Sequence, residues 1–369
     1  MKMMSTEAWV LHRSEQGAGY PATLVRENFE FPDIDENEVL ARPLFGCWEG
    51  NMGHAIQRSP IDICAERGEE KVVIGNSGVV QVTRCGSAVT TVREGDICLI
   101  FSNGMPDEFG YPKRIFAFDA PGTMGVLART IKLDQRNVIR IPENTRFKLE
   151  QWAAFSLRYI TAWANWRVAW GCWQLQMPEV PPSEVYVWAW GGGTAYAQIL
   201  LAKEMGCPVV MLASTPERIA HLKGLGIDAV DRSAFGEKTF EEDLLAAVRE
   251  RTGGRGVSIF IDHIGAHYRS TIKALGRQGV ITTSGWKRAM TYPTVRAAEC
   301  IARHVHVFTH YARYQEGLEA VAFAEERGWV PSLDGKVYTF DEIPTLAEQY
   351  VAGKLESYFP IFSVNAREA

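Results

Sequence analysis

The sequence predicts an α/β protein with two domains, one rich in β-strands and one built on a doubly wound parallel sheet. Up to about residue 150, short β-type runs alternate with Gly and Pro turns, whereas helical patterns begin near residue 148 and alternate with strands up to about residue 310. Residues 184–218 read in order as strand, glycine turn, helix and strand. A β-rich half followed by an α/β half is typical of two separate domains.

The β-type runs of the first half lie at 8–11, 38–41, 78–84, 96–101, 115–118 and 138–141. The segment RCGSAVTTVREGDICLI (84–100) reads as strand, turn and strand, as in a compact β-barrel. In the second half, we expect strands at 185–189, 209–212, 229–230, 257–261 and 279–283. The tail, 318–364, mixes helices with the strand-like KVYTF and YFPIF, and periodicity alone assigns it to neither domain.

The glycine turn is the most informative part of the chain. An apolar run meets Gly191, Gly192 and Gly193, and a helical pattern over 196–205 and a second apolar run over 208–212 follow. Glycine has no Cβ, so a pyrophosphate can approach its backbone, and the amides at the start of the helix, including those of Thr194 and Ala195, point at the phosphates. The spacing Ala-x-x-Gly-x-x-Ala (189–195) departs from three glycines, but the flanking strands and helix favour a dinucleotide-binding unit.

The end of the second strand of this unit predicts NADPH rather than NADH. NAD-specific folds place an acidic residue there, on the ribose hydroxyls. Here the strand ends without one: Ser214 and Thr215 can donate to a 2′-phosphate, and Arg218 or Arg232 can pair with it.

Composition excludes several classes of function. The formal charge is −5 with no long basic run, so nothing indicates nucleic acid or an anionic membrane surface. No apolar stretch has the ~18 residues that span a bilayer, and the N-terminus lacks the apolar core of a signal peptide. The seven cysteines are scattered without a C-x-x-C pair. This pattern predicts a soluble protein of a reducing compartment, the cytoplasm.

Tryptophans gather at the predicted domain boundary. Seven of the eleven lie between residues 152 and 190, and Trp163, Trp166, Trp170 and Trp173 recur at helical spacing. They indicate either a thickly packed helix, at the boundary or at a dimer contact, or the aromatic wall of a substrate cleft.

The order of elements, the strings GVVQVTRCGSAVTTVREGDICLI and LAKEMGCPVV, the glycine turn and the last strand KVYTFDEI resemble the medium-chain dehydrogenase/reductase superfamily over nearly the whole chain. The resemblance implies a GroES-like β-barrel catalytic domain made of residues 1–150 and 311–369. It also implies a Rossmann NADP-binding domain at 151–310, and a homodimer built on edge strands of that domain.

Many members of this superfamily bind zinc, and this chain departs from their pattern. Cys47 stands where the first catalytic ligand would be, but the position of the family's G-H-E reads Gly75-Asn76-Ser77. AAFSLRYITAW offers no Cys for the third ligand, and SNGMPDEFGYPKR lacks the four-cysteine structural lobe. Because even an open zinc site takes about three protein ligands, we expect no metal and interpret Cys47 as a small buried residue.

The strings DAVDRSAFG, FIDHIGAHYRS, GVITTSG and GKVYTFDEI are similar to those of the crotonyl-CoA carboxylase/reductase branch of zinc-free enoyl-thioester reductases. This resemblance implies NADPH-dependent reduction of an α,β-unsaturated acyl thioester, held by CoA or an acyl carrier protein. Hydride adds to the β-carbon, and the α-carbon then takes a proton or, in the carboxylating enzymes, CO₂. The alternatives are a quinone or enone oxidoreductase and a non-catalytic NADPH-binding protein.

The carboxylating relatives hold CO₂ with an Asn, a Phe-Glu pair and a His. Here His263 matches the His, Phe118-Asp119 matches the pair, and Glu49 falls on the Asn. An ionised Glu can only accept hydrogen bonds, and its charge opposes a new carboxylate, so Glu49 argues against carboxylation unless it is protonated. A buried Glu49 with a raised pKa could instead supply the α-proton.

Each of these residues also has a plainer interpretation. His263 would be a polar residue whose hydrogen bonds are all made within the protein. Glu49 would be the ion-pair partner of an Arg or Lys, and Asp119 would be a turn residue. By position in the family, Tyr159 and Thr161 line the cofactor cleft, although as isolated residues they would be assigned to the core.

Overall fold

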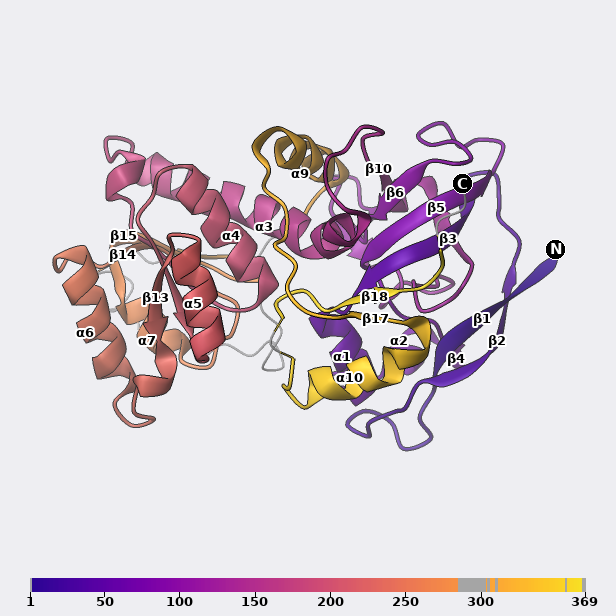
Figure 1. Ribbon diagram of the computed structural model, residues 1–369, viewed down its shortest axis with the longest axis horizontal. Coiled ribbons are helices and arrows are strands. Elements are labelled where there is room, and N and C mark those ends of the chain that lie inside the picture. Colours follow the sequence, from indigo (N-terminus) through magenta and orange to yellow (C-terminus); the bar gives the residue numbers. More distant parts are fainter. Residues whose placement is uncertain (1, 285–302, 304–305, 309–310, 356, 367–369) are drawn as a thin grey trace. The chain divides into compact units, whose positions relative to one another are not determined.

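A computed structural model describes residues 2–284, 303, 306–308, 311–355 and 357–366 of the protein (Figure 1). The chain divides into two compact units. Unit 1 combines Met1–Ile160 with Ala312–Ala369, and unit 2 is Thr161–Tyr311. The long helix α3 (Leu149–Gln176) contains the first boundary.

Unit 1 is built mainly from strands. Its longest described sheet has the order β10-β6-β5-β3-β18-β17, with β9 also pairing with β3. A further sheet has the order β2-β1-β4, and β7 pairs with β8. The strands are β1 (Met3–His12), β2 (Val25–Pro32), β3 (Glu38–Cys47), β4 (Lys71–Val72), β5 (Gly78–Cys85), β6 (Ile97–Ile100), β7 (Met105–Pro106), β8 (Pro112–Arg114), β9 (Ile131–Asp134), β10 (Val138–Arg140), β17 (Val337–Tyr338) and β18 (Ile361–Ser363).

The C-terminal tail completes the sheet of unit 1. Strand β18 runs antiparallel to β3, with Ile361 opposite Cys47. The helices of the unit, besides the first part of α3, are α1 (Gly50–Gln57), α2 (Ile63–Arg67), α9 (Tyr314–Arg327) and α10 (Ile343–Val351), with short 3-10 turns η1 (Gln135–Asn137) and η4 (Phe340–Glu342).

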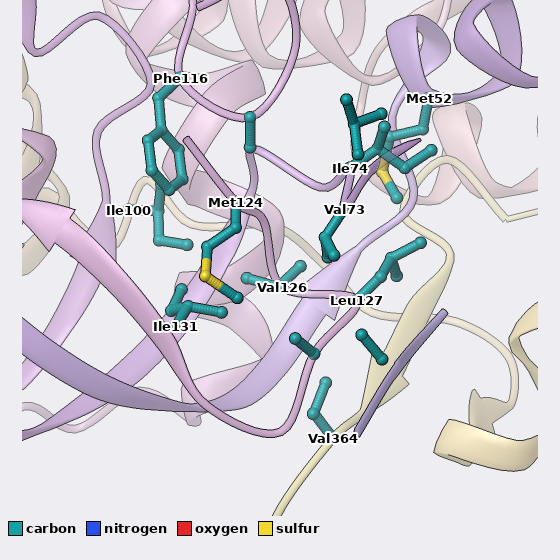
Figure 2. Close-up of a cluster of buried hydrophobic side chains, with 14 of the residues drawn as sticks. Met52, Val73, Ile74, Ile100, Phe116, Met124, Val126, Leu127, Ile131 and Val364 are labelled. Carbon is teal, nitrogen blue, oxygen red and sulfur yellow. The ribbon is translucent and has the colours of Figure 1, made fainter. Parts of the chain in front are cut away.

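Buried aliphatic side chains hold the strands of unit 1 together. Figure 2 shows Met124, Val126 and Ile131 pointing toward one another, and Val364 of the tail belongs to the same cluster. Each of these four side chains is at most 3% exposed. The core therefore joins residues from both ends of the chain.

One predicted strand is wrong. Residues 115–118 form a tight turn, in which Ile115 O accepts hydrogen bonds from the amides of Phe118 (3.2 Å) and Ala120 (3.1 Å). Ala117 adopts φ +52°, outside the β region. The apolar run indicates burial, as observed, but a short buried run does not by itself define a strand.

Unit 2 is a parallel sheet with the strand order β13-β12-β11-β14-β15-β16 among the described residues. This is the order 3-2-1-4-5-6 of a doubly wound dinucleotide-binding fold. The fold class predicted from the sequence is confirmed. The strands are β11 (Val187–Trp190), β12 (Val209–Ala213), β13 (Asp228–Asp231), β14 (Val257–Asp262), β15 (Leu275–Thr282) and β16 (His306–Phe308).

Among the described residues of unit 2, the helices are the rest of α3, α4 (Gly193–Glu204), α5 (Pro216–Gly224), α6 (Phe240–Thr252) and α7 (Tyr268–Lys273), with 3-10 turns η2 (Pro182–Glu184) and η3 (Arg232–Ala234). Strands β11, β12 and β14 are buried along their whole length, as expected for a parallel sheet covered on both faces.

The tryptophan-rich part of α3 is packed within unit 2. Trp166 and Trp173 are buried, and Trp166 stacks on Trp170 with ring centroids 5.8 Å apart. The Nε1 of Trp166 also donates to Met205 Sδ at 3.1 Å. These contacts favour the packed-helix interpretation of this segment. In the described part of the chain, no helix combines the length and apolar character that crossing a membrane requires.

Candidate functional site

The glycine turn joins β11 to α4, and its glycines have different surroundings. A Cβ on Gly191 would lie 2.7 Å from the Cβ of Ala195 and 3.1 Å from that of His263, so this position is closed to any side chain. Gly192 has φ −93° and ψ −148°, and no atom lies within 4 Å of where its Cβ would be. Gly191 therefore permits close packing of strand and helix, while the backbone of Gly192 is open to a ligand.

Helix α4 begins directly after this open position, at Gly193. Thr194 is half-buried in its first turn, and Ala195 is fully buried against the turn. The first amides of a helix have no intrahelical acceptor and carry the positive end of the dipole. The turn thus offers backbone donors to an anion, and Ala195 serves the packing of the turn.

The end of β12 gathers the residues predicted to recognise a 2′-phosphate. Ser214 is exposed, and its Oγ accepts a hydrogen bond from Arg232 Nε at 3.1 Å. Thr215 caps α5 by accepting from the backbone N–H of Arg218. The guanidinium of Arg232 also lies 5.8 Å from the ring of Trp190, the last residue of β11. A hydroxyl and a cation therefore meet beside the carboxyl ends of the first two strands of the unit.

His263 follows β14 and is buried with both ring nitrogens occupied. The backbone N–H of Ser284 donates to Nδ1 at 3.1 Å, so Nδ1 carries no proton. Nε2 then carries the proton and donates to Gln198 Oε1 at 2.6 Å. Burial lowers the pKa of His263 to about 3. The imidazole is accordingly neutral near pH 7, in a defined tautomer.

Asp262 shapes the loop that carries His263. Its Oδ1 accepts from the amides of Ile264 (3.0 Å) and Gly265 (2.8 Å), and its Oδ2 accepts from Thr271 Oγ1 at 2.9 Å. Burial raises the pKa of this carboxyl, which these hydrogen bonds oppose. Sequence reasoning missed this positioning role, although an Asp directly after a buried strand is a signal for it.

In unit 1, Glu49 forms a buried ion pair. Arg158 Nε lies 2.6 Å from Glu49 Oε2, and the two side chains are 8% and 3% exposed. Arg158 also donates to the carbonyls of Trp48 (2.6 Å) and Tyr358. Burial raises the pKa of Glu49, and the charge of Arg158 opposes the shift. The interpretation of Glu49 as an ion-pair partner agrees with these contacts, and its partner was not foreseen.

Tyr159, next to Arg158, lies in an aromatic cluster of unit 1. Its ring is fully buried, with centroids 4.7 Å from Trp329, 5.3 Å from Phe155 and 5.9 Å from Phe359. Thr161, two residues further along α3, belongs to unit 2, where its carbonyl accepts from Asn165 Nδ2 at 3.0 Å.

Phe118 and Asp119 occupy the turn that replaces the predicted strand. Asp119 Oδ1 accepts the backbone N–H of Ile115 at 2.6 Å, and Arg114 lies 3.9 Å from Oδ2. Phe118 is 7% exposed and belongs to the hydrophobic core of unit 1. These contacts favour the turn interpretation of Asp119.

No group of three His, Cys, Asp or Glu side chains suited to a metal ion occurs in the described ranges. Cys47 is fully buried, and burial raises its pKa well above the ordinary value. A neutral thiol is a poor metal ligand, since thiolate is the form that binds.

The predicted site residues therefore fall into separate groups. Unit 2 brings Gly191, Ala195 and His263 together at the turn, and Ser214 and Arg232 at the neighbouring strand end. Unit 1 holds Glu49 against Arg158 and places Tyr159 in an aromatic cluster, whereas Phe118 and Asp119 lie in their own turn.

Residues 193–326 match the family model described as zinc-binding dehydrogenase. A search of curated proteins found no match to the chain.

Solved structures are similar over nearly the whole chain. A crotonyl-CoA carboxylase/reductase has a TM-score of 0.81 and 19% identity, covering 99% of this chain and 89% of that one. The 2-octenoyl-CoA carboxylase reductase CinF, in complex with NADP and 2-octenoyl-CoA, has a TM-score of 0.79 and 17% identity, covering 99% and 88%. A thermostable alcohol dehydrogenase from Pyrobaculum aerophilum has a TM-score of 0.75 and 16% identity, covering 98% and 100%. The chain has the fold of these enzymes, and it resembles the medium-chain dehydrogenase/reductase superfamily and its crotonyl-CoA carboxylase/reductase branch, as its sequence predicts.

Proposed function

We propose that the protein is an NADPH-dependent oxidoreductase that reduces an α,β-unsaturated acyl thioester carried by CoA or an acyl carrier protein. The assignment of NADPH rests on two features of unit 2, the open backbone at Gly192 and the Ser214–Arg232 pair. Similarity to a carboxylase/reductase bound to NADP and an enoyl-CoA supports the substrate class.

The residues present fit this cofactor. The first amides of α4 would hold the pyrophosphate, and Ser214, Arg232 and Arg218 would contact the 2′-phosphate. Bound NADPH supplies the hydride that adds to the β-carbon. The protein then has to orient the acyl chain, stabilise the enolate oxygen and control the electrophile at the α-carbon.

We propose protonation as the fate of the enolate. The ion pair revises the electrostatic part of this argument, because Arg158 compensates the negative charge of Glu49 that would oppose a new carboxylate. Glu49 still cannot donate a hydrogen bond to CO₂ while it is ionised. His263 has both ring nitrogens engaged, so it would have to release Gln198 or Ser284 before binding CO₂.

The same engagement of His263 favours a second candidate, a non-catalytic NADPH-binding protein. In that case the turn and the Ser214–Arg232 pair would bind cofactor tightly, without turnover of any enoyl thioester.

One experiment separates these possibilities. Purified protein is mixed with NADPH and crotonyl-CoA in saturating bicarbonate, NADPH oxidation is followed, and products are identified by mass spectrometry. The proposal expects steady oxidation with butyryl-CoA as the main product. Ethylmalonyl-CoA as the main product would contradict the proton assignment, and tight NADPH binding without oxidation across a panel of enoyl-CoAs would favour the non-catalytic protein.

We further propose that the protein is a homodimer through edge strands of the parallel sheet. Light scattering at micromolar concentration tests this, and a monomer mass would contradict it.

A further inference from the structure

We propose that Asn76 binds substrate, with its side-chain amide donating to the carbonyl oxygen of the acyl thioester beside Glu49. This assignment rests on the proposed function and deepens it, because it names the donor that stabilises the enolate oxygen.

The side chain of Asn76 is buried without satisfying its polar atoms. The residue is 1% exposed, yet neither Nδ2 nor Oδ1 has a hydrogen-bond partner. Native proteins pair nearly all such groups, because an unpaired buried amide costs roughly 1–3 kcal/mol. The equally buried Asn137 follows that rule, since its Nδ2 donates to Phe101 O at 2.8 Å. The side-chain amide of Asn76 can therefore donate a hydrogen bond to a bound ligand and accept one from it.

The backbone holds Asn76 in place from both sides. Gly75 has φ +114°, a conformation that favours glycine, and its carbonyl accepts from the amide of Val126 at 2.9 Å. On the other side, Ser77 O accepts from the amide of Cys47 at 3.2 Å, and Ser77 Oγ bonds Ser156 Oγ at 2.9 Å. Hydrogen bonds thus join residues 75–77 to the segments of Val126, Cys47 and Ser156. Because the backbone is held on both sides, the Asn76 side chain cannot easily move to find a partner within the protein.

Glu49 has another buried atom without a hydrogen bond, in the segment next to that of Asn76. The Cys47–Ser77 hydrogen bond brings the end of β3 beside the loop of Asn76, and Ser77 lies next to the Glu49 carboxylate. Arg158 donates to Oε2 of Glu49, whereas Oε1 is buried and accepts no hydrogen bond of ordinary geometry. The Ser77 hydroxyl, which lies next to the carboxylate, is also within hydrogen-bond distance of Ser156 Oγ (2.9 Å) and Ala153 O (3.2 Å).

These atoms define the chemistry that fits. Asn76 Nδ2 presents N–H donors, which match a thioester carbonyl and bind the enolate oxygen more strongly once it gains negative charge. Asn76 Oδ1 accepts only, which matches a proton of a bound water. A donor placed at such an oxyanion contributes roughly 100- to 1000-fold to the rate.

The test measures crotonyl-CoA reduction by the full chain with two substitutions. Asn76→Leu removes both polar atoms, and Asn76→Asp keeps the shape but removes the donor. We expect each to lower kcat/KM roughly 100-fold or more, while the Kd for NADPH stays within about threefold. A loss of less than about tenfold in either variant overturns the proposal.

Thermal stability separates a binding role from a structural one. We expect Asn76→Leu to keep or raise Tm, because it removes unpaired polar atoms, whereas the control Asn137→Leu should lower Tm by leaving Phe101 O unpaired. Equal losses of Tm in both variants would identify Asn76 as a structural residue held by a buried water, and would overturn the proposal.

Calorimetric binding of butyryl-CoA in the presence of NADP⁺ distinguishes this proposal from the proposed function. Asn76-dependent binding without turnover of crotonyl-CoA would reject the function and support the site. Turnover and binding that are both unaffected by Asn76→Leu would support the function and reject the site.

Discussion

Arg158 and Glu49, which are 109 residues apart in the sequence, form a buried ion pair with 2.6 Å between Nε and Oε2. Arg158 also donates to two backbone carbonyls, one of them in the C-terminal tail of unit 1. The pair thus links the end of β3, helix α3 and the residues before β18. Removing one partner of a buried pair leaves an uncompensated charge, which is far more costly than removing both.

We therefore expect Arg158→Met to lower the free energy of unfolding by about 3–5 kcal/mol. Glu49→Gln with Arg158→Met should recover part of this loss, because no unpaired carboxylate remains. Urea unfolding measures both variants. The matched control is Arg93→Met, whose side chain is 74% exposed in its ion pairs and should cost less than about 1 kcal/mol. Equal losses for Arg158→Met and the control would contradict the assigned role of the pair.

The two glycines of the turn should respond differently to a methyl group. The methyl group of Gly192→Ala would meet no atom within 4 Å, so the variant should fold normally. The same methyl group stands where a pyrophosphate would approach, and it should weaken NADPH binding at least tenfold. Gly191→Ala would clash with Ala195 and should destabilise the protein by about 1–3 kcal/mol. Thermal unfolding and cofactor titration measure the two effects. Normal NADPH affinity in Gly192→Ala would rule out this turn as the pyrophosphate site.

Arg232→Ala should weaken NADPH binding roughly 10- to 100-fold, since a charge-assisted contact to phosphate contributes about 1.5–3 kcal/mol. NADH lacks the 2′-phosphate, so its Kd should change by less than about threefold. Arg218→Ala should show the same preference. Fluorescence titration with both cofactors decides the matter, and equal losses for NADPH and NADH would refute the assignment of these arginines.

Elemental analysis of protein purified without chelator should find no stoichiometric zinc. The reasons are the Asn76 and Ser77 side chains where zinc-binding relatives carry His and Glu, and the absence of a third Cys ligand in AAFSLRYITAW. The buried Cys47 has a raised pKa, which further disfavours the thiolate form that zinc needs. About one zinc per chain would contradict this expectation.

Local sequence patterns predicted the parallel sheet well. The expected strand at 209–212 is β12 (Val209–Ala213), and the one at 257–261 is β14 (Val257–Asp262), because fully buried strands are continuous apolar runs. Strand β2 (Val25–Pro32) was missed. Half of its sequence VRENFEFP is polar, half of its residues are exposed and only one is fully buried. Pairing with β1, rather than burial, defines that strand.

The candidate site was only partly predictable for a different reason. The glycine turn and the Ser214–Arg232 pair lie within one unit and carry local signals. The partners of Glu49 and His263 are contacts over 109 and 65 residues, which no periodicity reveals. The unpaired amide of Asn76 likewise becomes visible only once the burial of every neighbouring group is known.

The buried, neutral His263 should make the stability of the protein depend on pH. Its pKa is about 3 in the folded state, whereas an unfolded histidine titrates near 6.5. Between these values the unfolded chain binds a proton that the folded chain does not, so stability is full above pH 6.5 and is lost as the pH falls toward 3. At pH 5 the loss relative to pH 7 should reach about 2 kcal/mol, from 1.36 kcal/mol per pH unit. In urea unfolding, His263→Asn should lose correspondingly less stability between pH 7 and pH 5 than the wild type. The control is His12→Asn, which makes the same substitution at a side chain that is 46% exposed. If wild type and His263→Asn lose the same stability between pH 7 and 5, folding does not lower the pKa of His263, and the assigned effect of its burial is wrong.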